Sequence, residues 1–309
     1  MAEQGIFAYV FPGQGSQQVG MGRDLYDAFP QAREVFEEAD DALGFRLSRL
    51  CFEGPEAELA QTVNAQPAIL TVSFACLKAA GGLAGSLICP AFMAGHSLGE
   101  YTALVAAQVL DFKDAVKLTR RRGKLMQEAG KRVPGGMAAT IGLDEMLLEA
   151  ICEETGAQIA NINSPGQIVI SGTKQALVRA MDLARAMGAR HVIPLKVGGA
   201  FHSSLMQPAA EGMAQAISRF SFRDPAVPIV INSTAQPVTT AEAVREELLR
   251  QLCAPVQWQR SVEYMVDAGV STFIEIGPGQ VLSGLIKRID SQVQTLSVGD
   301  TSSVRAMSI

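Results

Sequence analysis

The sequence predicts an α/β fold in two parts, a large subdomain around a parallel sheet and a smaller subdomain inserted into it. Short apolar runs with the composition of buried strands alternate with longer segments that have helical periodicity. Between two glycine-containing breaks, Val133–Gly136 and Gly198–Gly199, the strands and helices follow an order of their own. We therefore expect residues 1–133 and 198–309 to form the large subdomain and residues 134–197 the small one.

Composition and charge argue against several classes of protein. Of the 309 residues, 48% are hydrophobic and 18% are charged, which favours a substantial core over disorder. The formal net charge of −5 argues against nonspecific binding to nucleic acid or to an anionic membrane. The five cysteines show no C-x-x-C spacing, so we expect reduced, buried thiols and no metal site. Because the start lacks a secretory signal and no apolar run reaches about 18 residues, we expect a cytoplasmic protein.

The first strand leads into a turn dense in glycine. Ile6–Phe11 is β-branched and aromatic, and Pro12-Gly13-Gln14-Gly15 follows it directly. Glycines in this place let the backbone approach a ligand or another loop closely. Because no lysine follows at the spacing of a phosphate-binding loop, a nucleotide site is disfavoured. Helices are expected at residues 29–41, 55–60 and 67–79.

A G-x-S-x-G pattern stands at the next change from strand to helix. An apolar stretch from Ile88 to Ala94 runs into Gly95-His96-Ser97-Leu98-Gly99, and a helix is expected from Glu100 to Leu110. The glycines permit a sharp turn that exposes the serine at a helix N-terminus, where partial positive charge suits a developing oxyanion. This context favours a nucleophilic Ser97 in an α/β-hydrolase-like subdomain; the alternative is a tight turn whose serine caps the helix.

The helix expected at residues 111–129 has an arginine in its apolar face. At 100° per residue, Arg122 lies in the middle of an apolar stripe. That stripe comprises Ala115, Leu118, Leu125, Met126 and Ala129. A buried guanidinium needs an anionic partner. The partner is either a core Asp or Glu in a structural salt bridge, or a substrate carboxylate clamped by the planar fork of the arginine.

The inserted segment has the order β-α-β-β-α-β. Strands are expected at residues 137–141, 158–163, 167–171 and 190–196, and helices at 144–155 and 174–187. This order and length are typical of a ferredoxin-like unit.

One of the three histidines is well placed to act as a base. His202 follows the glycine-rich turn Gly198–Gly199 and precedes a helix expected at residues 205–220, a position from which a loop side chain can reach a site. A nucleophilic Ser97 requires a base, and His202 is the best candidate. The alternative is a surface or capping histidine.

The rest of the chain returns to alternating strands and helices. Strands are expected at residues 227–232 and 272–276. Helices are expected within residues 239–253, from the turn Pro255–Trp258 to near Ala268, and at residues 281–288. The tail from Asp300 to Ile309 is expected to fray.

Taken together, these motifs resemble those of the malonyl-CoA:acyl carrier protein transacylases of type II fatty acid synthesis. They also resemble the acyltransferase domains of polyketide synthases, which share the same acyltransferase family. The matching segments are Phe11–Gln17, Gly95–Tyr101, Arg122–Gln127, Gly199–Ser203, Pro255–Trp258 and Gly277–Gly279, in the family order. They span nearly the whole chain.

The resemblance implies an acyltransferase that moves malonyl from malonyl-CoA to the phosphopantetheine thiol of acyl carrier protein by a ping-pong scheme. Ser97 is then the nucleophile and His202 the base. The backbone N–H groups of Gln14 and Leu98 form the oxyanion hole, and Arg122 binds the malonyl carboxylate.

Further details follow from the same resemblance. A backbone carbonyl near Gln257 is expected to orient the catalytic histidine, and Phe201 to favour malonyl over methylmalonyl. Neither a metal nor a cofactor is expected, and we expect a monomer. Because acyl carrier protein is acidic, docking requires a local basic patch. Candidates are Arg120, Arg121, Lys124, Lys131, Arg132, Arg185 and Arg190.

Other functions are compatible with part of this pattern. A stand-alone polyketide-type acyltransferase would carry the same residues. A serine thioesterase or hydrolase would share Ser97 and His202, but a neutral acyl group would leave Arg122 unpaired. A catalytically idle subunit that only binds a carrier protein would not need both Ser97 and His202.

Overall fold

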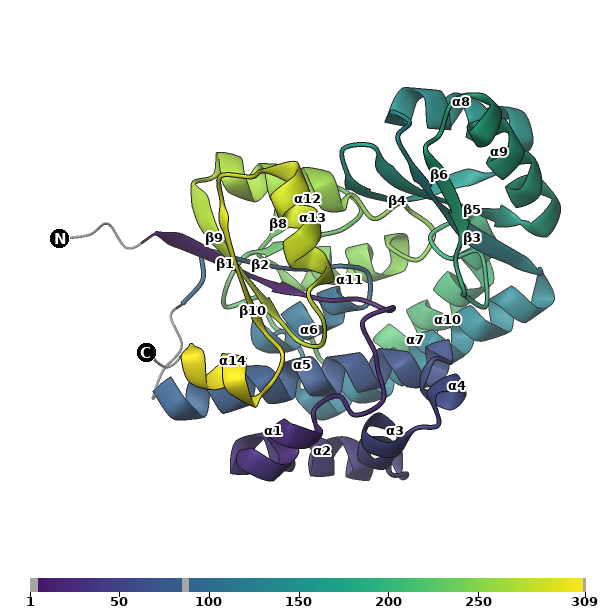
Figure 1. Ribbon diagram of the computed structural model, residues 1–309. Helices are drawn as coiled ribbons and strands as arrows, with labels where there is room; N and C mark the ends of the chain where they lie inside the picture. The colour runs from purple at the N-terminus through teal and green to yellow at the C-terminus, as the bar shows by residue number, and fades with distance from the viewer. Residues whose placement is uncertain (1–4, 85–88, 308–309) are drawn as a thin grey trace.

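The larger of two sheets organises the molecule. The computed structural model describes residues 5–84 and 89–307 (Figure 1). Six strands lie in the order β10-β9-β1-β2-β7-β8, and every neighbouring pair is parallel except β7 with β8. These strands are β1 (Ile6–Phe11), β2 (Phe92–Gly95), β7 (Ile229–Val230), β8 (Pro237–Val238), β9 (Val270–Ile276) and β10 (Gln294–Val298). The expectation of an α/β fold with a parallel sheet is confirmed.

Helices cover both faces of this sheet because the strands are apolar on both sides. In β1, Tyr9 and Phe11 belong to one core cluster, whereas Ala8 and Val10 belong to another. The first cluster packs against α2 (Pro30–Leu43), α5 (Thr62–Ala84), α6 (Gly99–Ala106) and α7 (Phe112–Arg132). The second packs against α12 (Trp258–Asp267) and α13 (Val281–Ile289), on the opposite side of the strands (Figure 1). Near-continuous apolar runs of this kind are typical of buried parallel strands.

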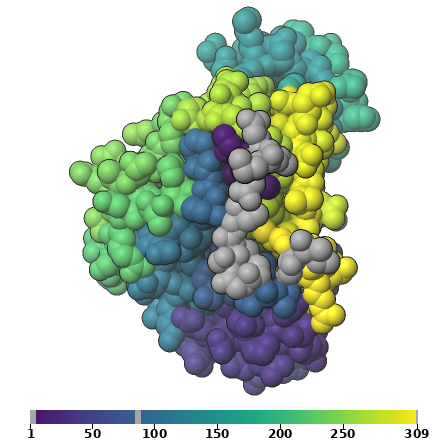
Figure 2. Space-filling model, turned by 90° about the vertical axis from the view of Figure 1, so that its left-hand side faces the viewer, coloured from purple at the N-terminus to yellow at the C-terminus, as the bar shows by residue number. Residues whose placement is uncertain are grey.

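The inserted segment forms the smaller, antiparallel sheet. Its strands, in the order β4-β5-β3-β6, are β3 (Gly135–Ile141), β4 (Gln158–Ser164), β5 (Gln167–Thr173) and β6 (His191–Pro194). With α8 (Glu145–Thr155) and α9 (Lys174–Ala186) this is the ferredoxin-like arrangement that was expected. Figure 2 shows this teal segment projecting at one end of the molecule, opposite the purple N-terminal helices. The subdomain boundaries at residues 134 and 197 stay predictions.

Hydrogen bonds of β4 attach the small sheet to the segment that contains Val256. The N–H of Ile162 donates to the carbonyl of Val256 (2.9 Å), and the N–H of Val256 donates to the carbonyl of Ala160 (2.8 Å). The edge strand β4 of the small sheet is thus attached to the segment before α12.

Several short elements were not expected from the sequence. They are α1 (Arg23–Ala28), α3 (Leu47–Glu53), β8 and β10. The expected strand 227–232 is only the two residues of β7, and α4 (Glu56–Leu59) is a single turn. The helix expected at residues 205–220 consists of the 3₁₀ turn η1 (Ser204–Met206) and α10 (Gln207–Ile217). The helix expected within residues 239–253 is α11 (Ala241–Arg250). The residue Ile88 of the expected elbow strand lies outside the described residues.

The expected fraying of the tail is wrong. Asp300 caps α14 (Thr301–Ala306): its carboxylate accepts from the N–H of Ser303 (2.8 Å), and the Ser303 side chain accepts from the N–H of Asp300 (3.1 Å). Such a reciprocal cap satisfies the free N–H groups of a first helical turn. Residues 308–309 lie outside the described residues.

Helices α5 and α7 are in backbone contact at a glycine. A Cβ added at Gly123 would lie 2.6 Å from the carbonyl oxygen of Thr62 and 2.8 Å from Cα of Val63. Because no side chain fits between them, the two helices approach closely enough for Gln66 on α5 to reach Arg122 on α7.

We predict that Gly123→Ala forces these helices apart and lowers the free energy of unfolding by about 1–3 kcal/mol, the usual cost of overpacking. Denaturant unfolding measures this change. The control is Gly284→Ala in α13, where an added Cβ meets no atom within 4 Å. There the higher helix propensity of alanine should leave stability unchanged or raise it by up to about 1 kcal/mol. Equal stabilities of the two variants would contradict the prediction.

Candidate active site

Ser97 lies on a sharp turn between β2 and α6. Its φ of 52° is in the left-handed region, which is strained for a non-glycine residue. A Cβ at Gly95 would lie 1.9 Å from the carbonyl carbon of Gly99, and one at Gly99 would lie 2.0 Å from the carbonyl oxygen of Phe11. Positions 95 and 99 must therefore be glycine, and the turn is in contact with the end of β1. The Ser97 side chain is left partly exposed at the start of α6.

His202 lies within hydrogen-bond distance of this serine. Its Nε2 is 2.8 Å from Oγ of Ser97, and its Nδ1 is 2.8 Å from the carbonyl oxygen of Gln251. Because a carbonyl can only accept, Nδ1 carries the proton, and Nε2 accepts from the serine hydroxyl. The structure thus brings together the predicted nucleophile and the predicted base from residues 105 positions apart.

The expectation that Gln257 orients the histidine is wrong. The side chain of Gln257 donates to the carbonyl of Ser233 (2.9 Å) and accepts from Arg260 (2.9 Å). The orienting carbonyl belongs to Gln251, immediately after α11. The last carbonyls of a helix have no partner within the helix, which leaves this one free to accept from His202.

Burial keeps the imidazole of His202 neutral. It is 4% exposed, and this burial, together with the positive charge of Arg122, lowers the pKa of His202 to about 3. The hydrogen bond to the Gln251 carbonyl acts in the opposite direction. A neutral imidazole with a free Nε2 lone pair can remove a proton from a hydroxyl.

Two backbone N–H groups, one in the elbow and one in the loop that packs against it, have no protein acceptor. Within the described residues, the N–H groups of Gln14 and Leu98 donate no hydrogen bond to another group of the chain. The loop that carries Gln14 lies against the elbow, because a Cβ at Gly13 would lie 2.4 Å from the carbonyl oxygen of His96. Such free N–H groups next to a nucleophile can stabilise a negatively charged oxygen.

Arg122 is 1% exposed and lies over the serine. Its Nη2 donates to Oγ of Ser97 (3.2 Å) and to Oε1 of Gln251 (2.9 Å), and its Nη1 donates to Oε1 of Gln66 (2.9 Å). No carboxylate of the described residues lies within 4.0 Å of it, and its Nε has no acceptor. The structural salt bridge that the sequence left open is therefore absent from this part of the chain. The guanidinium charge remains available to a ligand.

Other buried side chains hold the elbow, and sequence reasoning missed them. Asn232 accepts from the N–H of Ser97 (2.7 Å) and donates to the carbonyl of Gly95 (2.7 Å). Its own N–H donates to the carboxylate of Glu100 (2.9 Å). Burial and the nearby Glu247 raise the pKa of Glu100 well above its usual value. The available signal was a polar residue ending an apolar strand, which is too common to single out Asn232.

The remaining predicted residues lie around this centre. Phe201 is 5% exposed and belongs to the main core cluster. Nε2 of His96 is 2.8 Å from Oδ1 of Asn163, which links the elbow to the small sheet. Of the candidate basic patch, Arg120 is partly buried and bound to Asn64, whereas the other six residues are exposed.

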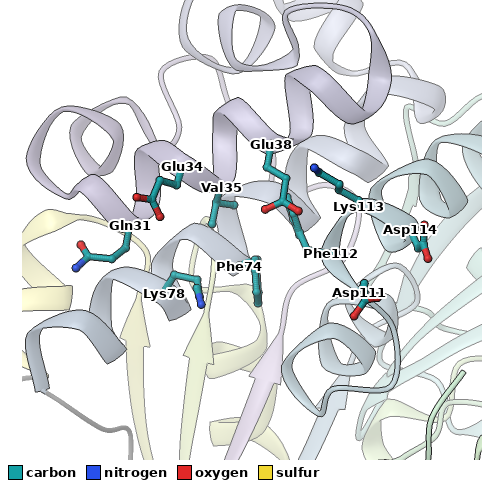
Figure 3. Close-up of a pocket in the computed structure, with 10 residues that line it drawn as sticks. All are labelled: Gln31, Glu34, Val35, Glu38, Phe74, Lys78, Asp111, Phe112, Lys113 and Asp114. Atoms are coloured by element: carbon teal, nitrogen blue, oxygen red, sulfur yellow. The ribbon is translucent and has the colours of Figure 1, made fainter. Parts of the chain in front are cut away.

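One surface pocket is separate from these residues. It has a volume of about 580 Å³ and lies between α2, α5 and the start of α7 (Figure 3). Side chains of both charges face it, including Glu38 and Lys78. None of its ten lining residues is a predicted site residue.

Metal and membrane features are absent from the described part of the chain. Residues 5–84 and 89–307 contain no group of three or more His, Cys, Asp or Glu side chains that could hold a metal ion. No helix in these ranges is long and apolar enough to cross a membrane.

Comparison with known proteins identifies the family. Residues 8–303 match the family model described as the acyl transferase domain. This chain belongs to the acyl transferase family. The family resemblance drawn from the motifs is confirmed.

Individual relatives match nearly the whole length of this acyl transferase. The malonyl CoA-acyl carrier protein transacylase of Bacillus subtilis is 47% identical over 302 residues, covering 96% of this chain and 94% of that protein. The Escherichia coli K12 protein of the same name is 46% identical, covering 97% and 98%.

Solved structures agree with the sequence comparison. The Coxiella burnetii malonyl CoA-acyl carrier protein transacylase has a TM-score of 0.94 at 42% identity, covering 98% of this chain and 96% of that one. A malonyl-transacylase in complex with AntF, a holo type II PKS acyl-carrier protein, has a TM-score of 0.94 at 45% identity, covering 98% of both chains.

The lowered pKa of His202 predicts how the stability of this acyl transferase depends on pH. The folded state disfavours the charged imidazole, so the unfolded chain binds a proton first as the pH falls. The contribution of His202 to stability is full above about pH 6.5 and is lost as the pH falls from 6.5 toward 3. Denaturant unfolding at about pH 7 and about pH 4 should show a smaller loss for His202→Gln than for the wild type. An identical loss in both proteins would contradict a buried neutral histidine.

Proposed function

We propose that this acyl transferase moves a malonyl group from malonyl-CoA to the phosphopantetheine thiol of acyl carrier protein through a malonyl ester of Ser97. The observation that carries the proposal is the buried guanidinium of Arg122, 3.2 Å from Oγ of Ser97 and without a carboxylate partner among the described residues. The relatives that match over their whole length are named for the same reaction. One of the solved structures is that of a malonyl-transacylase bound to an acyl-carrier protein.

In the first half-reaction, Oγ of Ser97 attacks the thioester carbonyl of malonyl-CoA while Nε2 of His202 takes the hydroxyl proton. The carbonyl oxygen becomes negatively charged and accepts from the N–H groups of Gln14 and Leu98. When the tetrahedral intermediate collapses, the carbon–sulfur bond breaks and the CoA thiolate takes the proton from His202. The product is the malonyl ester of Ser97.

In the second half-reaction, the phosphopantetheine thiol loses its proton to Nε2 of His202 and attacks the ester carbonyl. The same two N–H groups hold the oxyanion. The ester bond to Ser97 breaks, His202 returns the proton to Oγ, and malonyl leaves on the carrier protein. Because one base serves both halves, its imidazole must be neutral before each attack, as its burial favours.

Acyl selection rests on Arg122. Its charge is held in a buried site, where an unpaired ion is costly and attraction to an opposite charge is strong. A malonyl chain supplies the missing carboxylate, and a neutral acyl chain does not. This disfavours a general serine thioesterase or hydrolase.

Some finer expectations stay predictions. A stand-alone polyketide-type transferase would use the same geometry, and the preferred carrier protein separates it from an enzyme of fatty acid synthesis. Phe201 is expected to favour malonyl over methylmalonyl. The cytoplasmic location, the monomeric state and the basic patch for carrier-protein docking are likewise predicted.

Mixing the protein with malonyl-CoA should give a malonyl adduct on Ser97, located by mass spectrometry of peptides, because the serine is the nucleophile of the first half-reaction. Adding holo-acyl carrier protein should remove the label from Ser97 and place it on the carrier. Ser97→Ala should carry no adduct. A label on another residue, or hydrolysis without transfer, would refute the proposal.

Replacing Arg122 with alanine should remove the preference for malonyl. Loss of one partner of a buried charge pair costs about 2–5 kcal/mol, so kcat/KM for malonyl-CoA should fall about 30-fold or more. Labelling by acetyl-CoA, which has no carboxylate, should fall far less. The control is Lys117→Ala, an exposed position on the same helix, which should behave as the wild type. A parallel fall for both thioesters would argue against carboxylate binding by Arg122.

A further inference from the structure

The guanidinium of Arg122 is held by two neutral amide side chains instead of a carboxylate. Oε1 of Gln66 accepts from Nη1 and Oε1 of Gln251 accepts from Nη2, each at 2.9 Å. Gln66 is 1% exposed and Gln251 is fully buried. They come from distant parts of the chain, one from α5 and the other from the turn after α11.

The orientation of both amides is set by their nitrogen atoms. Nε2 of Gln251 donates to the carbonyl oxygen of Ser97 (3.0 Å), and Nε2 of Gln66 donates to Sδ of Met126 (3.2 Å). A guanidinium can only donate, so each oxygen must face Arg122. The two glutamines are therefore locked with their acceptors toward the charge.

A neutral acceptor and a carboxylate would act differently in this place. Either satisfies an N–H group, but only a carboxylate compensates the positive charge in the low-dielectric interior. Of the buried acids, Glu100 interacts electrostatically with Arg122 but forms no ion pair with it. Its carboxyl accepts from the N–H of Asn232, and burial raises its pKa well above the usual value, which favours the neutral form. Glu247 accepts from Ser233.

We propose that Gln66 and Gln251 are specificity-determining residues, which hold the guanidinium of Arg122 over Ser97 while leaving its charge uncompensated, so that the site favours acyl chains bearing a carboxylate. This inference rests on the proposed function. Two donors serve that carboxylate: the Nε–H, which has no acceptor, and the Nη2–H now directed at Oγ of Ser97. The second is released when Oγ becomes an ester oxygen, which is a poorer acceptor.

The test replaces an amide by its acid of the same shape. In Gln66→Glu a carboxylate lies against Arg122 and compensates its charge within the protein. The ratio of malonyl to acetyl labelling of Ser97, measured by mass spectrometry in a mixture of the two CoA thioesters, should fall about tenfold or more. Gln251→Glu should lower the same ratio, since its main-chain carbonyl still orients His202. Having two such variants keeps the test available if one of them fails to fold, which circular dichroism would show.

The matched control is Gln66→Met, which keeps the approximate size but has neither the strong acceptor nor a charge. It should slow labelling by both thioesters and leave their ratio near that of the wild type, because the charge of Arg122 remains uncompensated. If Gln66→Met lowers the ratio as much as Gln66→Glu, the glutamine acts through geometry alone and the inference is overturned. Wild-type ratios in the folded Glu variants would also overturn it.

The experiments distinguish a failure of the proposed function from a failure of the role assigned to Gln66 and Gln251. If the wild-type protein takes no malonyl label on Ser97, the proposed function fails. If the wild-type protein prefers malonyl over acetyl and both Glu variants keep that preference, only the role of the glutamines fails.

Discussion

The site depends on one positive charge kept inside the protein without a compensating carboxylate. Arg122 donates hydrogen bonds to Gln66, Gln251 and Ser97, and its guanidinium lies over the ring of Tyr101. For this to work, α5 must approach α7 closely, and Gly123 permits that approach. The same charge lowers the pKa of His202 and so helps to keep the base neutral. Under the proposed function, substrate recognition and base chemistry are thus tied to a single guanidinium.

Ser97, the predicted nucleophile, depends on a second constraint, which is the strained backbone of the elbow. Ser97 has a positive φ, and only glycine fits at positions 95 and 99. Asn232 holds the turn from the second residue after β7, and Gln251 holds it from the turn after α11. Such strain persists where the surrounding structure over-determines it. Two segments distant in sequence supply that support here.

The parts of the fold that the sequence predicted are those with repeated local patterns. β1 matches the apolar run Ile6–Phe11. α7 and most elements of the ferredoxin-like unit are seven residues or longer, so their periodicity can be recognised in the sequence. Elements such as α1 and the two-residue β8 are too short for a period to be recognised. The helix α14 depends on a reciprocal cap at Asp300, a local hydrogen-bond pattern that composition does not show.

The sequence by itself determined the elbow around Ser97, the candidate base His202 and a buried arginine in need of an anion, because each follows from residue type and local spacing. Only the tertiary structure decided which carbonyl orients the histidine, since Gln251 and Gln257 are both distant from His202 in the chain and only Gln251 faces the ring. It also decided that Arg122 has amides for neighbours. A long-range contact of this kind depends on how closely two helices pack, and no local pattern records that distance.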